Sequence, residues 1–201
     1  MIASLTGVLK IKSPTEILLD VNGVGYAILI PLSTFETLGE TGTTITLLTH
    51  LQVREDALQL YGFASETELV LFKLLISVTG IGPKIAQGIL SGISASDLKN
   101  YLVQGNVGAL TAIPGVGRKT AERLILELRD KVNKEETTSA LSIQSSSKDS
   151  VRTQALLALT SLGYSRPVAE KALRRALDDA NGSDQSIEDL IKSALKYSRS
   201  K

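Results

Sequence analysis

The sequence contains no cysteine and no tryptophan, and only 4% of its residues are aromatic. Without cysteine the chain can form no disulfide, thiolate zinc site or cysteine nucleophile, which favours a reducing compartment. It also lacks an apolar run of the roughly 20 residues that a membrane-spanning helix needs. The first residues, MIASLTGVLKIKSPTE, show no basic segment followed by an apolar one, the pattern of a secretory leader. We therefore expect a cytoplasmic protein that has no membrane partner.

Catalytic and motor motifs are equally scarce. His50 is the only histidine, so no Ser-His-Asp triad or histidine-rich metal cluster can be built around it, and we interpret it as a structural residue with satisfied hydrogen bonds. The phosphate-binding motif GxxxxGK[ST] does not occur, because Lys84 stands in GIGPKIA. The sequence predicts a non-enzymatic chain without catalytic residues, metal or cofactor. Any ATP-driven work would have to come from a partner.

The charge is distributed unevenly, although the net charge is only +1. Residues 1–64 contain 3 basic and 6 acidic residues, whereas residues 65–134 contain 9 basic and 6 acidic ones. The acidic part also comprises five short segments rich in Val, Ile, Leu and Thr, separated by turn signals such as Asn22-Gly23. These segments predict a five-stranded barrel. Its few aromatic residues and its negative charge argue against single-stranded nucleic acid as a ligand.

The helical part that follows contains an internal repeat. The segment LLISVTGIGPKIAQGIL (74–90) resembles GALTAIPGVGRKTAERLIL (108–126), and aligning Gly80 with Gly115 gives a period of 35 residues. Each copy has an apolar helix, a Gly-x-Gly turn and a second helix that carries basic residues. Because a helical pattern precedes the glycines, a dinucleotide-binding fold, which needs a strand there, is disfavoured.

Each Gly-x-Gly turn is a candidate phosphate site. The first backbone N–H groups of a helix have no partner within the helix and lie at the positive end of its dipole. We expect the glycines to adopt backbone angles closed to other residues and to leave room for a phosphate oxygen. The alternative, that they only turn one helix into the next, is weakened by the second copy. The candidate DNA-backbone-binding residues are Gly80, Gly82, Lys84, Gly115, Gly117, Arg118, Lys119 and Arg123.

The remaining sequence predicts a linker and a small helical domain. Residues 135–150, EETTSALSIQSSSKDS, contain 8 Ser or Thr and little to bury, which favours a flexible linker. Helical patterns then follow in residues 151–201, one of them after Pro167 and one opened by the box-like SIED. The predicted domains are 1–64, 65–134, the linker 135–150, and 151–201.

Taken together, these segments resemble the RuvA family, the Holliday-junction-binding subunits of the bacterial branch-migration complex. The resemblance runs from MIASLTG through NGVGYAILIP, THLQVREDALQLYGF and both Gly-x-Gly segments to ALTSLGYS, and it covers nearly all of the chain outside the linker. It implies an α+β multidomain fold: an OB-fold barrel, tandem helix-hairpin-helix motifs that bind DNA without reading its sequence, and a mobile three-helix, UBA-like domain.

The resemblance also implies partners. These are four-way junction DNA, the hexameric RuvB ATPase and the RuvC resolvase, in homologous recombination, DNA repair and the SOS response to DNA damage. A homotetramer is implied, and either one tetramer or two, as an octamer, could clasp the junction. Leu159, Leu162 and Tyr164 match the family's apolar region that contacts RuvB. The alternative is that these three side chains fill the core of a small domain.

Glu55 and Asp56 stand side by side in VREDALQL, between two predicted strands and without a conventional turn residue. A catalytic metal site is disfavoured, because adjacent residues of an extended chain point to opposite faces and no third carboxylate lies near them in sequence. They could form a solvated turn, or they could repel phosphates. The resemblance implies the second: an acidic pin at the centre of a tetramer that keeps strands apart. Arg54 could pair with the two acids or touch a DNA backbone.

Two other classes of function stay open at this stage. A nuclease or repair enzyme could use the Gly-x-Gly turns as its DNA grip, with Glu55 and Asp56 catalytic, and it would cleave junction DNA in Mg²⁺ without a partner. A pure protein-interaction scaffold would bind no DNA even at low salt.

Overall fold

The computed structural model of the chain describes residues 1–55, 57–144, 147–179 and 186–198. It forms two compact units, Met1–Lys134 and Glu135–Lys201. Within the described ranges, no helix is both long enough and apolar enough to cross a membrane. In chain order the elements are β1 (Ser4–Lys12), β2 (Glu16–Val21), β3 (Val24–Leu29), α1 (Leu32–Thr37), β4 (Thr44–Val53), β5 (Leu58–Phe63), α2 (Glu66–Ile76), α3 (Pro83–Gly92), α4 (Ala95–Gln104), α5 (Val107–Thr111), α6 (Arg118–Gln144), α7 (Ser147–Ser161), α8 (Arg166–Asp179) and α9 (Ile187–Ser198).

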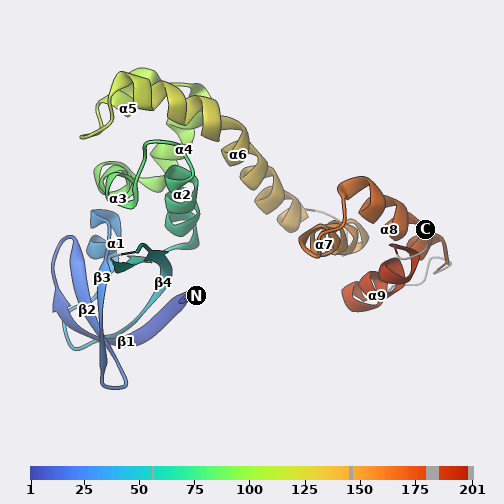
Figure 1. The fold of residues 1–201 in the computed structure, drawn as a ribbon, viewed down its shortest axis with the longest axis horizontal. Helices are drawn as coiled ribbons and strands as arrows, with labels where there is room; N and C mark the ends of the chain where they lie inside the picture. Colours follow the sequence, from blue (N-terminus) through green and yellow to red (C-terminus); the bar gives the residue numbers. More distant parts are fainter. Residues whose placement is uncertain (56, 145–146, 180–185, 199–201) are drawn as a thin grey trace. The chain divides into compact units, whose positions relative to one another are not determined.

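The strands close into a barrel in the order β1-β2-β3-β5-β4, which confirms the predicted barrel (Figure 1). Strand β1 closes it by pairing with β2 through one half and with β4 through the other. The register shifts between Leu9 and Ile11, and the resulting bend allows β1 to pair with both β2 and β4. Because the barrel is closed, the backbone N–H and C=O groups that an open sheet would expose at its edges are paired. The tight β2–β3 turn has Asn22 at φ 52° and Gly23 at φ 87°, as its Asn-Gly sequence predicts.

Strands β4 and β5 extend past the barrel core as a hairpin. On β4, Leu47 is 1% exposed, whereas Val53 is 62% exposed. Val53 pairs with Leu58 of β5, which is 72% exposed. Alternation along β4 places Val53 on the same strand face as Leu47 and Leu51, but burial along that face ends before Val53. The last apolar pair of the hairpin therefore lies in solvent, beside the acidic tip.

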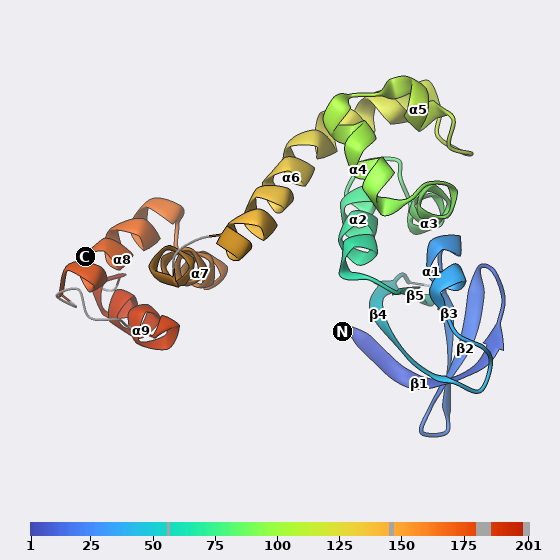
Figure 2. The same ribbon diagram turned by 180° about the vertical axis from the view of Figure 1, so that it is seen from behind.

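The barrel and the first helices share a hydrophobic core. Tyr61 and Phe63, both on β5, are buried among the helical residues, and their rings lie 5.0 and 4.8 Å from that of Phe72 on α2. Both ribbon views show α2 continuing from β5 with α3 beside it (Figures 1 and 2). Packing therefore runs without a break across the predicted boundary at 64/65, and that boundary stays a prediction.

The second unit contains α7, α8 and α9 around a small core. Its buried residues are mostly alanine and leucine, which allow a close approach of the helices; they are Ala155, Leu159, Ala169, Ala172, Leu173, Ala176, Leu190 and Ala194. The backbone N–H of Asp189 donates to Ser186 Oγ at the start of α9, as the SIED segment predicts.

The predicted linker, 135–150, coincides with helical backbone. Helix α6 continues to Gln144 and α7 begins at Ser147, while 145–146 lies outside the described residues. Glu, Ala and Leu in this segment are good helix formers, and this accounts for helical backbone in a segment with little to bury. The two compact units separate after Lys134. That the segment works as a flexible linker stays a prediction.

We predict that Gly7→Ala destabilises the barrel, because the added Cβ would lie 2.3 Å from the backbone oxygen of Asp20. Overpacking of this kind lowers the free energy of unfolding by about 1–3 kcal/mol. Urea unfolding followed by circular dichroism measures it. Gly88→Ala is the control, because a Cβ there meets no atom within 4 Å and alanine in a helix gains up to about 1 kcal/mol over glycine. Parental stability of Gly7→Ala would contradict the prediction.

Candidate nucleic-acid interface

The two Gly-x-Gly turns have the same backbone hydrogen bonds, displaced by 35 residues. In each copy, one bond ends the first helix, one closes the turn, and one begins the next helix. The three pairs are Val78 N to Leu75 O (3.1 Å) with Ile113 N to Leu110 O (3.2 Å), Ile81 N to Val78 O (3.0 Å) with Val116 N to Ile113 O (3.1 Å), and Ala86 N to Gly82 O (3.0 Å) with Ala121 N to Gly117 O (2.9 Å). The internal repeat is therefore a structural repeat.

The first glycine of each pair is the one that the backbone requires. Gly80 has φ +90° and Gly115 has φ +85°, a region that other residues rarely adopt. Gly82 has φ −86°, and Gly117 is not among the described glycines with positive φ. The expectation that all four glycines adopt restricted angles is thus wrong for Gly82 and Gly117. A Cβ at either of these two positions would meet no atom of the described part of the chain within 4 Å.

The helices that follow the two turns begin without a side-chain cap. Helices α2, α4 and α5 start at Ser65, Ser94 and Asn106, whose side chains accept a hydrogen bond from a first-turn N–H. In α3 the first helical hydrogen bond is accepted by the backbone oxygen of Gly82, and in α6 by that of Gly117. Glycine has no side chain that could cap the helix. Pro83, the first residue of α3, has no N–H. The other N–H groups at the starts of α3 and α6 receive no side-chain cap from Gly82 or Gly117, and with the helix dipole they attract an anion.

The basic residues of the two turns differ in what they contact. Lys84 and Lys119 occupy equivalent positions and are both exposed. Arg118 pairs with Glu122 at 3.0 Å, but its side chain is 84% exposed, so this pair adds little to stability. Two exposed lysines thus lie at matching places next to the uncapped helix starts.

Arg123 has a structural contact that the sequence did not reveal. Its Nη1 donates to the backbone oxygen of Thr79 at 2.7 Å, across 44 residues of sequence. A Cβ added at Gly80 would lie 3.6 Å from the same nitrogen. Arg123 therefore ties the helix after the second turn to the first turn and holds the two candidate phosphate sites together.

The β4–β5 hairpin presents the acidic tip. The backbone N–H of Arg54 donates to the oxygen of Ala57 at 2.9 Å and closes the turn. Arg54 and Glu55 are exposed, whereas Asp56 lies outside the described residues. Among the described residues, no three His, Asp or Glu side chains converge as a metal site would require. The described tip is a short, exposed turn carrying at least one carboxylate.

His50 lies on β4 and packs against the helical core. Its ring meets that of Phe72 edge-on, with centroids 5.5 Å apart. Its Nδ1 is buried and has no hydrogen-bond partner among the residues that the structure describes, so the expectation of satisfied hydrogen bonds is wrong for this atom. Burial lowers the pKa of His50, as does the charge of Lys73 to a smaller extent, while a hydrogen bond with Gln52 acts in the opposite direction. The neutral ring is thus favoured, as suits a packing residue.

The three residues predicted to contact RuvB have different environments. Leu159 is fully buried in the core of the second unit, so it holds the helices together and a partner cannot reach it unless they separate. Leu162 is 61% exposed. Tyr164 is half-buried and packs on the same core. Gly163, with φ +95°, lets the chain turn sharply between α7 and α8.

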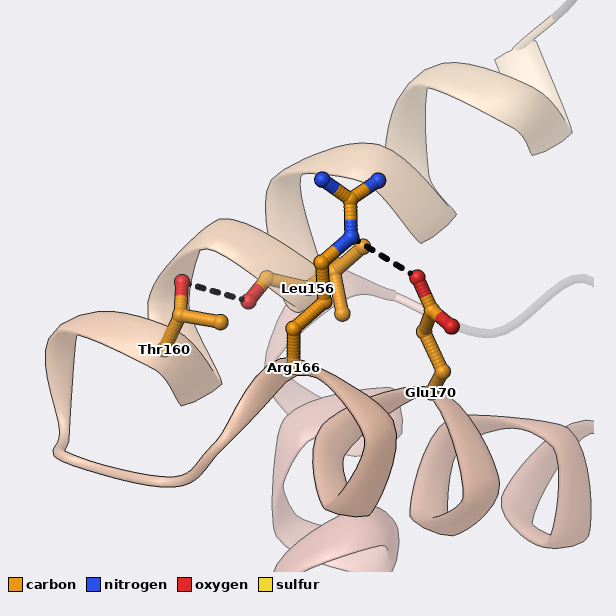
Figure 3. Close-up of polar contacts among 4 residues, drawn as sticks. All are labelled: Leu156, Thr160, Arg166 and Glu170. Atoms are coloured by element: carbon orange, nitrogen blue, oxygen red, sulfur yellow. Dashed lines mark hydrogen bonds and ion pairs between the residues drawn. The ribbon is translucent and has the colours of Figure 1, made fainter.

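Figure 3 shows one polar contact within each of the two helices that flank the α7–α8 corner. Thr160 Oγ1 donates to the Leu156 oxygen at 3.0 Å, and Arg166 pairs with Glu170 at 2.9 Å. Leu157 on α7 is a further exposed apolar residue, 51% exposed, that the sequence patterns did not indicate. Its position, off the apolar stripe of α7, is the signal that could have found it.

Comparison with known families matches the chain in three parts. Residues 1–62 match the RuvA N terminal domain, residues 72–130 the SAM-like helix-hairpin-helix tandem, and residues 150–198 the RuvA C-terminal domain. A curated relative from Geobacter sp. (strain M21) is 48% identical over 200 residues, which cover 98% of both chains. The chain belongs to the RuvA family. A relative from Pelobacter propionicus is 47% identical over 199 residues, again with 98% of both chains covered.

The RuvA family membership explains the repeat. The tandem helix-hairpin-helix match contains both Gly-x-Gly turns, so the predicted motif is confirmed. Both relatives carry the name Holliday junction branch migration complex subunit RuvA.

We predict that Gly80→Ala and Gly115→Ala each destabilise the first unit, because alanine at these φ angles is strained by about 1–3 kcal/mol. Gly82→Ala and Gly117→Ala are matched controls in the same turns. They lose only the preference of an N-cap for glycine over alanine, so we expect each to cost less than its partner, at most about 1 kcal/mol. Urea unfolding of the four variants measures the difference. Equal stability of the two pairs would show that the positive φ angles impose no requirement for glycine.

Proposed function

We propose that this protein binds four-way (Holliday) junction DNA as the non-catalytic subunit of a branch-migration complex, in homologous recombination and DNA repair in the cytoplasm. The observation that carries the proposal is the duplicated turn, in which two uncapped helix starts, each with an exposed lysine, are held together by Arg123. The curated relatives are named as subunits of such a complex, and the RuvB ATPase performs the ATP-driven step.

The chemistry of the turns suits a DNA backbone. Backbone N–H groups and lysines reach phosphates, and contacts to phosphates position DNA without reading bases. Such binding releases condensed counterions, so its affinity falls steeply with salt. The proposed phosphate contacts come from Gly82, Lys84, Gly117 and Lys119, with Arg118 beside them, while Gly80, Gly115 and Arg123 shape the turns.

The four arms of a junction call for more than one copy of the chain. Each copy has one pair of turns, which is enough to grip one duplex arm. A closed ring of four identical subunits matches the four arms, so we propose a homotetramer, or two tetramers facing each other across the DNA. The barrel would supply the subunit contacts, and its acidic tips would meet at the crossover.

The second unit is proposed to bind RuvB. Leu162 and Leu157 are exposed on the α7 side of the α7–α8 corner, and Tyr164 adds a half-buried ring. The proposal rests on the family resemblance of this segment, and the exposure of Leu157 and Leu162 leaves apolar side chains available to a partner. RuvC, which would resolve the junction, is proposed as a second partner.

We predict that Lys84→Gln combined with Lys119→Gln flattens the dependence of junction affinity on salt. The slope of log K against log salt should change by roughly 0.9 for each lost phosphate contact. Arg123 is left intact, because its removal would also release Thr79. Lys171→Gln on α8 is the control for loss of an exposed lysine. A parental slope in the double variant would mean that the two lysines are merely solvated.

We predict that neutralising the acidic tip, with Glu55→Gln and Asp56→Asn, leaves junction binding intact and weakens discrimination against plain duplex. Carboxylates repel phosphates, and the repulsion is strongest where water and salt are excluded. Gel-shift titrations with junction and duplex measure the ratio of affinities. Glu36→Gln with Glu40→Gln removes the same charge elsewhere on the barrel as a control. An unchanged ratio in the tip variant contradicts the proposed role, and cleavage of junction DNA in Mg²⁺ would favour the nuclease alternative instead.

A further inference from the structure

Buried polar side chains gather at one place in the first unit. Among the described residues, the buried polar side chains are Thr34 (0% exposed), Thr49 (1%), Glu68 (7%) and Gln87 (9%). Thr34, Glu68 and Gln87 belong to α1, α2 and α3, which meet where the barrel joins the helices. Burying polar groups is unfavourable unless they are hydrogen-bonded, so this concentration calls for an explanation.

Glu68 caps its own helix and also forms hydrogen bonds with α1 and with the end of the barrel. Its carboxylate accepts a hydrogen bond from the backbone N–H of Ser65 (3.3 Å), and its own N–H donates to Ser65 Oγ (3.2 Å), which together form the capping box of α2. The carboxylate also accepts from the N–H of Ala64 (3.1 Å). It also accepts from the hydroxyls of Ser33 and Thr34 on α1. Within the described residues its charge is balanced by hydrogen-bond donors and by no salt bridge. One carboxylate therefore joins α1, the end of the barrel and the start of α2.

Gln87 holds the other side of the same segment. Its Nε2 donates to the backbone oxygens of Ile30 (2.7 Å) and Thr15 (3.2 Å), both in the barrel. One turn further along α3, Ser91 Oγ accepts from the N–H of Leu32 at 3.0 Å and donates to the Gln87 oxygen at 2.8 Å. Helix α3, which begins at the first phosphate-binding turn, is thus hydrogen-bonded directly to the barrel.

The repeat shows that a helix-hairpin-helix motif does not itself need these contacts. The position of Gln87 corresponds to Glu122 in the second copy, and that of Ser91 corresponds to Leu126. Glu122 lies on the surface and pairs with Arg118, and Leu126 is 83% exposed. The two copies share their turns but not this helix face. The first copy carries the barrel contacts as an addition.

These contacts connect the two parts of the proposed DNA site. The acidic tip lies at the far end of β5, which leads directly into α2, and the first phosphate-binding turn lies at the start of α3. Apolar contacts such as Tyr61 with Phe72 tolerate sliding, whereas hydrogen bonds are directional. We infer that Glu68 and Gln87 are positioning residues, which fix the tip relative to the turn and thereby set the preference for a four-way junction over duplex. This inference rests on the proposed function.

The first test compares junction and duplex binding in the full-length protein. Glu68→Gln keeps the side-chain shape but replaces one acceptor by a donor, and Gln87→Met removes both bonds to the barrel. We expect junction affinity to fall about tenfold, equivalent to 1.4 kcal/mol, and duplex affinity, which needs only the turns, to stay within about twofold. Ser33→Ala, which removes a single donor to Glu68, is the milder variant and should lower the ratio less. Circular dichroism establishes that each variant is folded.

Glu66→Gln is the matched control, because Glu66 lies in the same helical turn with the same charge and is exposed. Parental junction-to-duplex ratios in folded Glu68→Gln and Ser33→Ala would overturn the inference. So would an equal loss in Glu66→Gln. If the parent itself shows no preference for the junction, the proposed function fails, and the positioning role is then judged by a measurement without DNA.

That second measurement is the distance between the hairpin and α3. The chain has no cysteine, so Val53→Cys and Gly88→Cys, both at exposed positions, accept nitroxide labels selectively. Pulsed dipolar spectroscopy on labelled protein, diluted with unlabelled protein, gives the distance distribution within one subunit. We expect one narrow distribution in the parent and a broadened or shifted one with Glu68→Gln. Identical distributions would overturn the positioning role.

Discussion

The unsatisfied N–H groups at the start of a helix are the constraint on which the first unit depends. Three of its helices, α2, α4 and α5, start at a Ser or Asn whose side chain caps them, and α1 starts at Pro31 without a side-chain cap. Helices α3 and α6 start at Gly82 and Gly117. Leaving donors uncapped is unfavourable in isolation. It becomes useful when the missing acceptor is a phosphate oxygen. The fold repeats this arrangement at a spacing of 35 residues, and in the proposed function the two turns together form a two-point grip on the DNA backbone.

A grip on phosphates is only useful when it is held in a fixed relation to the rest of the protein. Arg123 bonds to Thr79 and joins the two turns. Tyr61 and Phe63 carry the barrel into the helical core. The hydrogen bonds of Glu68 and Gln87 then make that joint directional. In this account, selectivity for DNA shape arises from the rigidity between the grip and the acidic tip, because phosphate contacts alone do not distinguish one duplex from another.

Those features of the fold that depend on residues close together in the sequence could be predicted from the sequence. The barrel strands, the Asn22-Gly23 turn and the repeat are local patterns, and the structure confirms them. What the sequence left out or left open depends on tertiary packing. The bond from Arg123 to Thr79 spans 44 residues. Whether Leu159 contacts a partner or fills the core was left open, and its burial depends on two other helices. The proposed roles of Glu68 and Gln87 could not be predicted either. An acidic residue near a helix start is usually interpreted as a capping residue, and a glutamine as a surface residue.

Hydrogen–deuterium exchange of the full-length protein, with and without a synthetic four-way junction, tests the central claim most directly. The account predicts slower exchange of the backbone amides in residues 80–86 and, at the same offset of 35, in residues 115–121. The junction should slow exchange in both segments together, and it should slow exchange at residues 171–179 of α8 far less. Protection of only one turn, or protection confined to the barrel, would contradict a two-point grip on the DNA backbone.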